Sequence, residues 1–422
     1  KEVAKLITDG EKKIVVLSAM SGTTNTLVEI SDYLYKKNPE GANEIINKLE
    51  TKYKQHIDEL FATPEYKQKG LEIIKSHFDY IRSYTKDLFT LFEEKVVLAQ
   101  GELISTAMVN FYLQECGVKS VLLPALEFMR TDKNAEPDPI YIKEKLLAQL
   151  ELYPDADIYI TQGFICRNAY GEIDNLQRGG SDYTASLIGA AINASEIQIW
   201  TDIDGMHNND PRIVDKTAPV RQLHFEEAAE LAYFGAKILH PTCIQPAKYA
   251  NIPVRLLNTM DPEAPGTLIS NDTEKGKIKA VAAKDNITAI KIKSSRMLLA
   301  HGFLRKVFEI FESYQTSIDM ICTSEVGVSV TVDNTKHLNE ILDDLKKYGT
   351  VTVDKEMCII CVVGDLEWEN VGFEAKALDA MRDIPVRMIS FGGSNYNISF
   401  LIRECDKKVA LQSLSDMLFN GK

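Results

Sequence analysis

The sequence has few histidines and none of the common motifs for a protein-bound metal ion. Seven histidines occur in 422 residues. A His-Glu-x-x-His motif and a pair of Cys-x-x-Cys motifs, which supply zinc ligands in many proteins, are both missing. We therefore expect no metal centre built from protein side chains alone.

Cysteines are also few, and their pattern argues against a disulfide framework. The seven cysteines are odd in number, scattered, and mostly surrounded by apolar residues. This usage is typical of a reducing compartment and predicts a cytoplasmic protein. Cys358 and Cys361 have the spacing of a redox motif, but they lie in the apolar run 357–363. We predict that this run is a buried strand.

Basic residues are outnumbered, and long hydrophobic runs are missing. The chain has 48 Lys and Arg against 61 Asp and Glu, for a net charge of -13 and a pI near 5.2. A nucleic-acid partner is not expected, because phosphate binding requires a basic face. The apolar runs are shorter than a membrane span, so no membrane segment is expected either. The length and the 45% hydrophobic content predict a soluble protein of two or three domains.

Three apolar runs end in small polar residues. Residues 13–18, 158–164 and 197–202 read as parallel strands buried on both faces. Ligands of open α/β sheets bind at the carboxyl ends of such strands, so we expect one shared crevice there. Residues 43–98 have helical spacing, broken at Thr63 and Pro64, and predict a helical hairpin packed on the sheet.

A glycine-rich loop is the most informative local feature. The run from Arg178 to Thr184 places two glycines between a cation and a Ser-Asp pair, directly before a helix of small and apolar residues. Glycines let backbone N–H groups approach an anion, and the helix start adds a positive dipole end. An ordinary glycine-rich turn is the alternative; the Arg, Ser and Asp favour an anion site. Glu102, beside Gly101, can bind an ammonium group, although such residues more often complement the helix dipole.

From about Val281 the pattern changes to short strands and amphipathic helices. We predict strands at 287–292, 317–321 and 328–332, and helices at 303–314 and 335–347. Residues 317–321 match 385–389, and residues 328–332 match 398–402. The repeat predicts two ferredoxin-like βαββαβ units that stack their sheets around a ligand seam, or alternatively two inert packing modules.

Taken together, the motifs resemble those of aspartate kinases across nearly the whole chain. The resemblance is carried by residues 17–25, 101–106, 178–184, 201–202, 210–212 and 234–241 and by the paired tail units. It implies an α/β amino-acid-kinase (carbamate-kinase-like) sandwich with a mostly parallel sheet and a helical insert at about 31–98, followed by two ACT domains. The implied boundaries are 1–280, 281–354 and 355–422. The implied reaction is phosphorylation of the L-aspartate side chain by ATP and Mg²⁺, as the first step toward lysine, threonine and methionine.

The resemblance also implies site residues. Substrate would be bound by Thr24, Glu102, Arg178 and Ser181, and the nucleotide by Thr201, Asp202, His207, Arg212 and Lys237. Asp182 would organise neighbouring lysines around the phosphates, which makes Arg178, Asp182 and Lys237 the catalytic set. Magnesium would be held mainly through ATP oxygens and water. A carboxylate nucleophile needs no general base, which fits the lack of a Ser/His/Asp or Cys/His arrangement.

The tail resembles the effector region of lysine-inhibited members. The implied effector residues are Met297, Gly302, Phe303, Leu304, Ser317, Ile318, Asp319, Thr323, Ser324 and Glu325. Asp319 and Glu325 would receive an ammonium, and backbone N–H groups near Gly302 a carboxylate. Ala300 stands where a serine is common. We expect feedback by L-lysine, with threonine as the alternative, in a homodimer formed through the ACT domains, or a tetramer.

The chain departs from the family in three places. The Lys-Phe-Gly-Gly-Thr-Ser strand that opens family members is missing before Lys1, so we expect the natural chain to start further upstream; otherwise activity would be severely impaired. Gln177 replaces a glycine and His207 a tyrosine. Two rival functions remain at this point, namely a kinase for glutamate or a nucleotide and a catalytically silent amino-acid sensor.

Overall fold

A computed structural model describes residues 1–176, 179–235, 239–294 and 301–420. The chain forms two compact units. Unit 1 contains Lys1–Ile199 and Thr242–Val254, and unit 2 contains Trp200–Pro241 and Arg255–Lys422. Each is described by itself.

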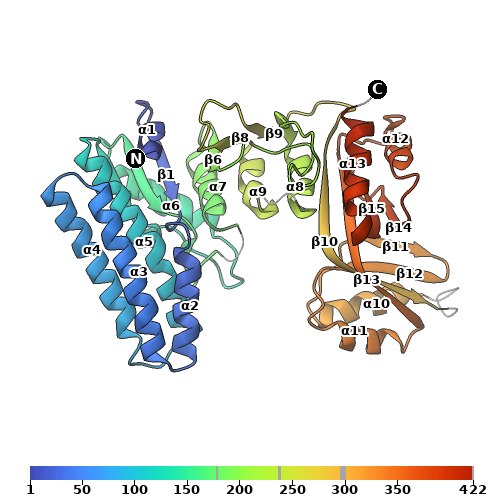
Figure 1. The fold of residues 1–422 in the computed structure, drawn as a ribbon, viewed down its shortest axis with the longest axis horizontal. Helices are drawn as coiled ribbons and strands as arrows, with labels where there is room; N and C mark the ends of the chain where they lie inside the picture. The colour runs from blue at the N-terminus through green and yellow to red at the C-terminus, as the bar shows by residue number, and fades with distance from the viewer. Residues whose placement is uncertain (177–178, 236–238, 295–300, 421–422) are drawn as a thin grey trace. The chain divides into compact units, whose positions relative to one another are not determined.

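Unit 1 combines a parallel sheet with a helical bundle (Figure 1). Its helices are α1 (Glu2–Ile7), α2 (Thr23–Tyr35), α3 (Pro39–Leu60), α4 (Pro64–Ser83), α5 (Leu91–Glu115), η1 (Ala125–Glu127), α6 (Pro139–Glu151), α7 (Gly180–Ile192) and α9 (Pro241–Ala250). Its strands are β1 (Lys13–Leu17), β2 (Ser120–Leu123), β3 (Ile158–Gln162), β4 (Ile165–Arg167), β5 (Ile173–Asn175) and β6 (Ile197–Thr201), the last of which crosses into unit 2.

The first sheet has the order β1-β3-β2, with both neighbouring pairs parallel. Side chains of a strand alternate between its faces, and here both faces are covered. Ile158 and Ile160 of β3 pack with Leu113 of α5 on one face, while Tyr159 packs with α6 and α7 on the other. Burial on both sides explains the continuous apolar run of β3, whereas β1 is half-buried along its length. The parallel pairing of the two strands confirms the expected parallel strands at 13–18 and 158–164.

Helices α2 to α5 lie side by side as a bundle (Figure 1). Pro64 occupies the first turn of α4, which places the break at Thr63 as expected. Helix α5 begins with a capping box, in which Thr90 and Glu93 satisfy each other's backbone N–H groups. The predicted hairpin is therefore present, and α2 and α5 complete a four-helix core around Tyr53 and Phe78.

Helix α5 is the one helix of the described ranges that is long and apolar enough to cross a membrane. However, 72% of its most apolar stretch is buried inside the protein. The residues that give it this composition therefore pack against the bundle and the sheet, as in a core helix.

Unit 2 contains the remaining elements. Its strands are β7 (Gln222–His224), β8 (Val254–Asn258), β9 (Thr267–Ser270), β10 (Ile278–Lys293), β11 (Ile321–Ser324), β12 (Gly327–Val332), β13 (Thr350–Gly364), β14 (Val386–Phe391) and β15 (Asn397–Arg403). Its helices are α8 (Phe225–Tyr233), α10 (Phe303–Ser313), α11 (Leu338–Leu345), α12 (Phe373–Ala380), η2 (Glu404–Asp406) and α13 (Lys407–Leu418).

The strand at 197–202 is present as β6, but it does not join the sheet of β1 and β3. It belongs to a separate sheet of order β6-β8-β9-β7. The expectation of three neighbouring strand ends in one sheet was wrong in this respect, because an apolar run predicts a strand without specifying its neighbours.

The repeated tail forms one continuous sheet of order β11-β12-β10-β13-β15-β14. Strands β10 and β13 are long enough to serve both repeats. Residues 287–293 of β10 pair with 350–357 of β13, whereas residues 278–284 pair with 359–364. Two ferredoxin-like units were expected to stack their sheets, but they share two strands instead (Figure 1). The domain boundaries 281 and 354/355 stay a prediction, and both fall inside shared strands.

Each repeat has its own hydrophobic core. Phe303, Val307 and Ile341 belong to the core of the first unit, and Phe373, Phe400 and Leu411 to that of the second. Cys358 and Cys361 are fully buried in β13, which confirms the strand interpretation. Burial raises the pKa of both thiols, so they stay protonated.

Candidate active site

Three segments of unit 1 meet at the carboxyl end of β1. They are the loop from Ser18 into α2, the middle of α5, and the start of α7. Gly101 of α5 permits this approach, because a Cβ atom there would lie 2.9 Å from Ala19 Cβ and 3.2 Å from Thr23 Cγ2. The glycine of the Gln-Gly-Glu motif is therefore required for packing, and it brings Glu102 against the loop after β1.

Two serines join the β1 loop to the glycine-rich loop. Ser18 Oγ donates to Ser181 Oγ at 2.7 Å, and Ser105 Oγ donates to the Ser18 carbonyl at 2.8 Å. A side chain at Gly163, after β3, would collide with Ser181. Polar atoms from the ends of β1 and β3 and from α7 thus converge, as the sequence predicted for these two strands.

Glu102 is a buried carboxylate with half of its hydrogen-bonding capacity unused. The residue is 3% exposed. Oε1 accepts the Ala19 N–H at 3.3 Å, whereas Oε2 has no partner among the described residues. Burial raises the pKa of Glu102 to about 7, and the Ala19 N–H offsets part of that effect. A buried carboxylate of this kind favours a cationic ligand that would restore the lost solvation.

The helices α2 and α7 both start at this place with glycine caps. Gly22 and Gly179 adopt φ of 80° and 76°, and neither helix has a side-chain cap. Thr24 lies in the first turn of α2 and is half-buried, as is Asp182 in the first turn of α7. Burial raises the pKa of Asp182 to about 6. Arg178 lies outside the described residues, so its predicted role is neither supported nor contradicted by geometry.

The predicted nucleotide residues lie in unit 2. Thr201 ends β6, and its carbonyl accepts the Thr259 hydroxyl at 2.7 Å and the Thr259 N–H at 2.8 Å. Asp202 is exposed in the following turn. His207 is half-buried, and its Nδ1 lies 3.0 Å from Thr217 Oγ1. Burial lowers the pKa of His207 and favours the neutral ring.

Arg212 is exposed and paired with a neighbour in its own turn. Its Nε and Nη2 donate to the two carboxylate oxygens of Asp210 at 2.9 and 2.7 Å. The guanidinium is thereby oriented while its remaining donors face solvent. Lys237, the second predicted phosphate cation, lies outside the described residues.

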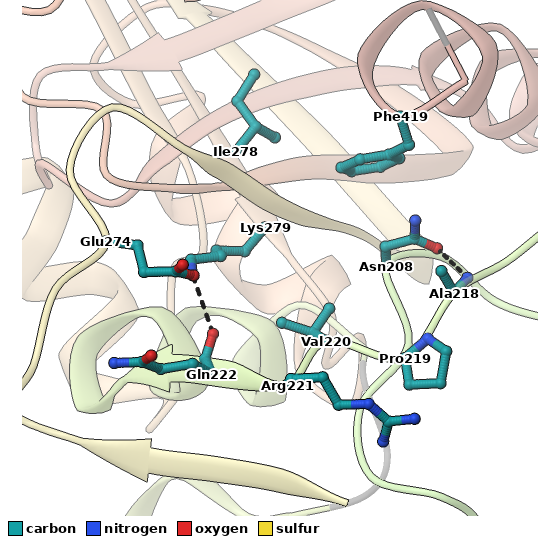
Figure 2. Close-up of a pocket in the computed structure, with 10 residues that line it drawn as sticks. All are labelled: Asn208, Ala218, Pro219, Val220, Arg221, Gln222, Glu274, Ile278, Lys279 and Phe419. Atoms are coloured by element: carbon teal, nitrogen blue, oxygen red, sulfur yellow. Dashed lines mark hydrogen bonds and ion pairs between the residues drawn. The ribbon is translucent and has the colours of Figure 1, made fainter.

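The loop carrying His207 and Arg212 is anchored to the C-terminal repeat. Asn209 Nδ2 donates to the Leu411 carbonyl at 3.0 Å, and Val214 is buried in the core of the second repeat. A cavity of about 270 Å³ lies beside the same loop, between Pro219, Lys279 and Phe419 (Figure 2).

The predicted effector residues come from two segments of the first repeat. Gly302 caps α10 with φ of 81°, and Phe303 packs in the same core as Ile318. Leu304, Ser317, Thr323, Ser324 and Glu325 are exposed. Residues 317–319 were expected to be a strand, but β11 begins only at Ile321. Met297 lies outside the described residues.

Asp319 is the predicted effector residue with the most unusual surroundings. Its side chain is 1% exposed, and Oδ1 accepts Lys284 Nζ at 2.7 Å and Tyr233 Oη at 2.9 Å. Oδ2 has no partner within the described ranges. Burial raises the pKa of Asp319, against the opposing effect of Lys284. Lys284 also contacts Asp333 at 2.9 Å.

The sequence analysis gave no role to several residues that contact the predicted site residues or their neighbours. Ser18 was part of a motif but received no role, and its position after an apolar strand was the available signal. Tyr53, whose hydroxyl lies 2.9 Å from Thr23 Oγ1, looked like one more residue of a helical core stripe. Lys284 and Tyr233 gave no signal, because their partner Asp319 is distant in sequence.

The chain matches two known families. Residues 1–258 match the amino acid kinase family, and residues 360–418 match the ACT domain. Aspartokinase 1, chloroplastic, of Arabidopsis thaliana is 35% identical over 445 residues, covering 100% of this chain and 78% of that protein. Lysine-sensitive aspartokinase 3 of Escherichia coli K12 is 32% identical over 428 residues, covering 98% of this chain and 94% of that protein.

Solved aspartokinase structures are also similar to this chain over nearly its whole length. The E. coli aspartokinase III structure in complex with aspartate and ADP (R-state) has a TM-score of 0.84 and 31% identity, covering 99% of this chain and 96% of that chain. The structure of that enzyme with lysine and aspartate (T-state) has a TM-score of 0.80 and 32% identity, covering 99% and 95%.

Proposed function

This chain belongs to the aspartokinase family, and we propose how its own residues bind the substrates, transfer the phosphoryl group and respond to an effector. The reaction is ATP-dependent phosphorylation of the side-chain carboxylate of L-aspartate to 4-phospho-L-aspartate. The matches to aspartokinases along the whole chain favour aspartate over glutamate or a nucleotide as acceptor, and an enzyme over a silent sensor.

The substrate ammonium binds Glu102. The observation that carries this assignment is the buried Oε2 without a partner. An ammonium there completes the hydrogen bonding of a carboxylate that burial otherwise keeps partly protonated. Ser181, Thr24 and Arg178 take the substrate carboxylates: Ser181 and Thr24 stand in the first turns of α7 and α2, where the N–H groups favour anions.

Phosphoryl transfer needs no base, because the acceptor is already a carboxylate. Catalysis consists of holding the two substrates in line and neutralising charge on the moving group. We assign the phosphates to Lys237 and Arg212, with Asp182 organising cations at the start of α7. Thr201 and Asp202 bind the nucleotide, and the neutral, half-buried ring of His207 stacks on the base.

ATP carries Mg²⁺ into the site. The described residues contain no group of three or more His, Cys, Asp or Glu side chains arranged to hold a metal ion. Mg²⁺ does not need a cluster of protein ligands, because it keeps several of its waters and binds mainly through phosphate oxygens. When bound, the ion neutralises charge between the phosphates.

Feedback acts through the ACT region, and L-lysine is the proposed effector. The lysine-sensitive E. coli relative is similar over nearly the whole chain. Asp319 offers a buried oxygen to an ammonium, and the glycine-capped start of α10 offers N–H groups to a carboxylate. The free cysteines are consistent with a cytoplasmic location.

We place a homodimer contact at the outer strands of the ACT sheet. Apolar side chains are exposed on β11 and β14, namely Ile321, Ile389 and Phe391. The two strands touch, since Cys322 Sγ donates to the Ile389 carbonyl at 3.0 Å. A second copy would cover this surface. Ile321→Glu should shift the sedimentation coefficient toward that of a monomer; an unchanged value would move the interface elsewhere.

The substrate assignment is tested by competition. ADP release should depend on L-aspartate, and calorimetry should show that succinate, which lacks the ammonium, binds at least about 100-fold more weakly. Equal binding of succinate and aspartate would remove the proposed role of Glu102. Equal turnover of L-glutamate would remove the proposed acceptor.

A further inference from the structure

Residues 281–284 of β10 touch the loop that carries the predicted nucleotide residues. The Val281 N–H donates to the Asn208 carbonyl at 2.8 Å, next to His207. Val214, at the other end of this loop, packs in the same core cluster as Val281. A displacement of this short stretch of β10 would therefore be felt directly beside His207.

The same stretch supports the end of α8. A Cβ atom on Gly235 would collide with the Ala283 carbonyl, so the backbone after α8 lies directly on β10. Lys284 Nζ lies over the Tyr233 ring, 4.5 Å from its centroid. Tyr233 is the last residue of α8, and its pKa is raised to about 12 by burial and by Asp319.

Lys284 links this stretch to the proposed effector residue Asp319. Its ammonium is shared between Asp319 at 2.7 Å and Asp333 at 2.9 Å. Tyr233 donates to the same Asp319 oxygen that Lys284 uses, while the second oxygen is buried without a partner in the described part of the chain. One oxygen of this carboxylate therefore binds side chains from two elements, and the other oxygen is buried and unpaired among the described residues.

The strand changes direction immediately after Lys284. Pairing with β13 is irregular between Lys284 and Ile287, and Asn286 adopts φ of 60°. Glu356 on the opposite strand adopts φ of 55°. Such irregularities bend a strand and interrupt its ladder. The bend separates residues 278–284, which pair within the second ACT unit, from 287–293 in the first.

The loop that carries His207 borders a cavity. The cavity of about 270 Å³ is lined by Asn208 and Pro219 of the loop and by Ile278 and Lys279 of β10 (Figure 2). Close-packed contacts resist small displacements, whereas atoms beside a cavity of this size can shift at lower cost.

We propose that Tyr233, Lys284 and Asp319 form the link through which a ligand in the first ACT unit alters nucleotide binding. A ligand ammonium that reaches the buried oxygen of Asp319, unpaired among the described residues, competes with Lys284 for a single negative charge. Lys284 then turns toward Asp333, Tyr233 loses its neighbour, and residues 281–284 transmit the change to the loop of His207. The inference rests on the proposed effector site, but its two ends can be tested separately.

The first experiment removes one hydroxyl. Calorimetry measures L-lysine binding to the protein with and without ATP and Mg²⁺. In the native protein the two ligands should weaken each other about fivefold or more, which is the usual size of such coupling. Tyr233→Phe should still bind lysine within about twofold of the native affinity while the coupling falls below about twofold. Tyr249→Phe, at an exposed tyrosine of α9, is the matched control and should keep the coupling.

The second experiment needs no effector. Lys284→Met removes the ammonium from the cluster, and we expect the KM for ATP to rise by about fivefold in the absence of any amino-acid effector. Native coupling that survives in Tyr233→Phe, or an unchanged KM in Lys284→Met, would overturn the link. A native protein that binds no lysine would instead overturn the proposed effector, and Lys284→Met would then decide the link alone.

Discussion

Two buried carboxylates, one in each compact unit, have the same unfinished hydrogen bonding but different neighbours. Glu102 and Asp319 each have an oxygen without a partner in the described residues. Glu102 has a single backbone donor and no ion-pair partner within the described ranges, whereas Asp319 already holds Lys284 and Tyr233. An ammonium at the first site would therefore have no internal cation to displace among the described residues. A ligand at the second must compete with an existing ion pair, so its binding changes the protein.

The largest effect is expected at the site without an internal cation. Glu102→Gln removes the charge that we propose receives the substrate ammonium, and kcat/KM for aspartate should fall by about 1000-fold. The variant should also be more stable, by about 1 kcal/mol or more, because the desolvated charge is gone. Steady-state kinetics and thermal unfolding measure the two. Glu94→Gln, at a half-buried position in the first turn of the same helix where the carboxylate accepts the Tyr35 hydroxyl, should change neither by a comparable amount; a parallel loss there would point to general damage of α5.

The regulatory carboxylate should give a smaller and separable effect. Asp319→Asn should weaken L-lysine binding by about 100-fold in calorimetry, while the KM for aspartate stays within about twofold. Unfolding free energy should fall by about 1–2 kcal/mol, since Lys284 keeps only Asp333. Asp333→Asn is the control, because its carboxylate is 41% exposed and is not part of the proposed ligand site. Equal lysine affinity in native protein and Asp319→Asn would contradict the assignment.

Glu102 should make both the KM for aspartate and the free energy of unfolding depend on pH. Burial raises the pKa of Glu102 in the free enzyme to about 7, and the proposed contact with the substrate ammonium needs the ionised form. The KM for aspartate should therefore rise about tenfold per unit as pH falls below that value. Stability changes in the other direction: between pH 4.5 and 7 the folded state binds more protons than the unfolded state, so unfolding free energy falls as pH rises. Glu102→Gln should lose this stability slope, and a retained slope would assign it to another group such as Asp182.

The smallest effect is expected in the second ACT unit, where a positively charged residue stands at the position equivalent to Asp319. Arg387 stands at the position that Asp319 occupies in the first repeat, and it pairs with Asp354 at 2.8 Å. A cation there repels an ammonium ligand. Arg387→Ala should leave lysine affinity unchanged within about twofold and lower stability by less than about 1 kcal/mol, because the ion pair is partly exposed. A large loss of lysine affinity would show that both repeats contribute to one site.

Local patterns predicted most elements correctly, and non-local pairings were beyond them. The break at Thr63 and the parallel strands followed from proline placement and from continuous apolar runs. The separate sheet of β6 did not, because its neighbour β8 lies some fifty residues away and leaves no mark on the run itself. The first half of β10 was missed for a similar reason: alternation is interrupted at Asp285 and Asn286, so the strand appeared to start at residue 287.

The candidate site divides in the same way. Glu102, Ser181 and Asp182 stand in motifs with a chemical reason for each residue type, so the sequence alone was enough to propose them. Lys284 has no motif. Its importance comes from Asp319, 35 residues further along the chain, and from Tyr233 on another helix. Such contacts depend on how strands pair, which only the folded arrangement specifies.

Because the two repeats share strands β10 and β13, the regulatory region cannot be truncated between the repeats without disrupting the sheet. Strands β10 and β13 each contribute one half to the first repeat and the other half to the second. Ending the chain near residue 354 would remove the second repeat and leave the first half of β10 as a long unpaired edge. Slow hydrogen exchange should therefore be lost from both repeats together, as one cooperative block. Swapping a single repeat between relatives would break that block, so exchange of regulatory properties by recombination requires both repeats to travel as a pair.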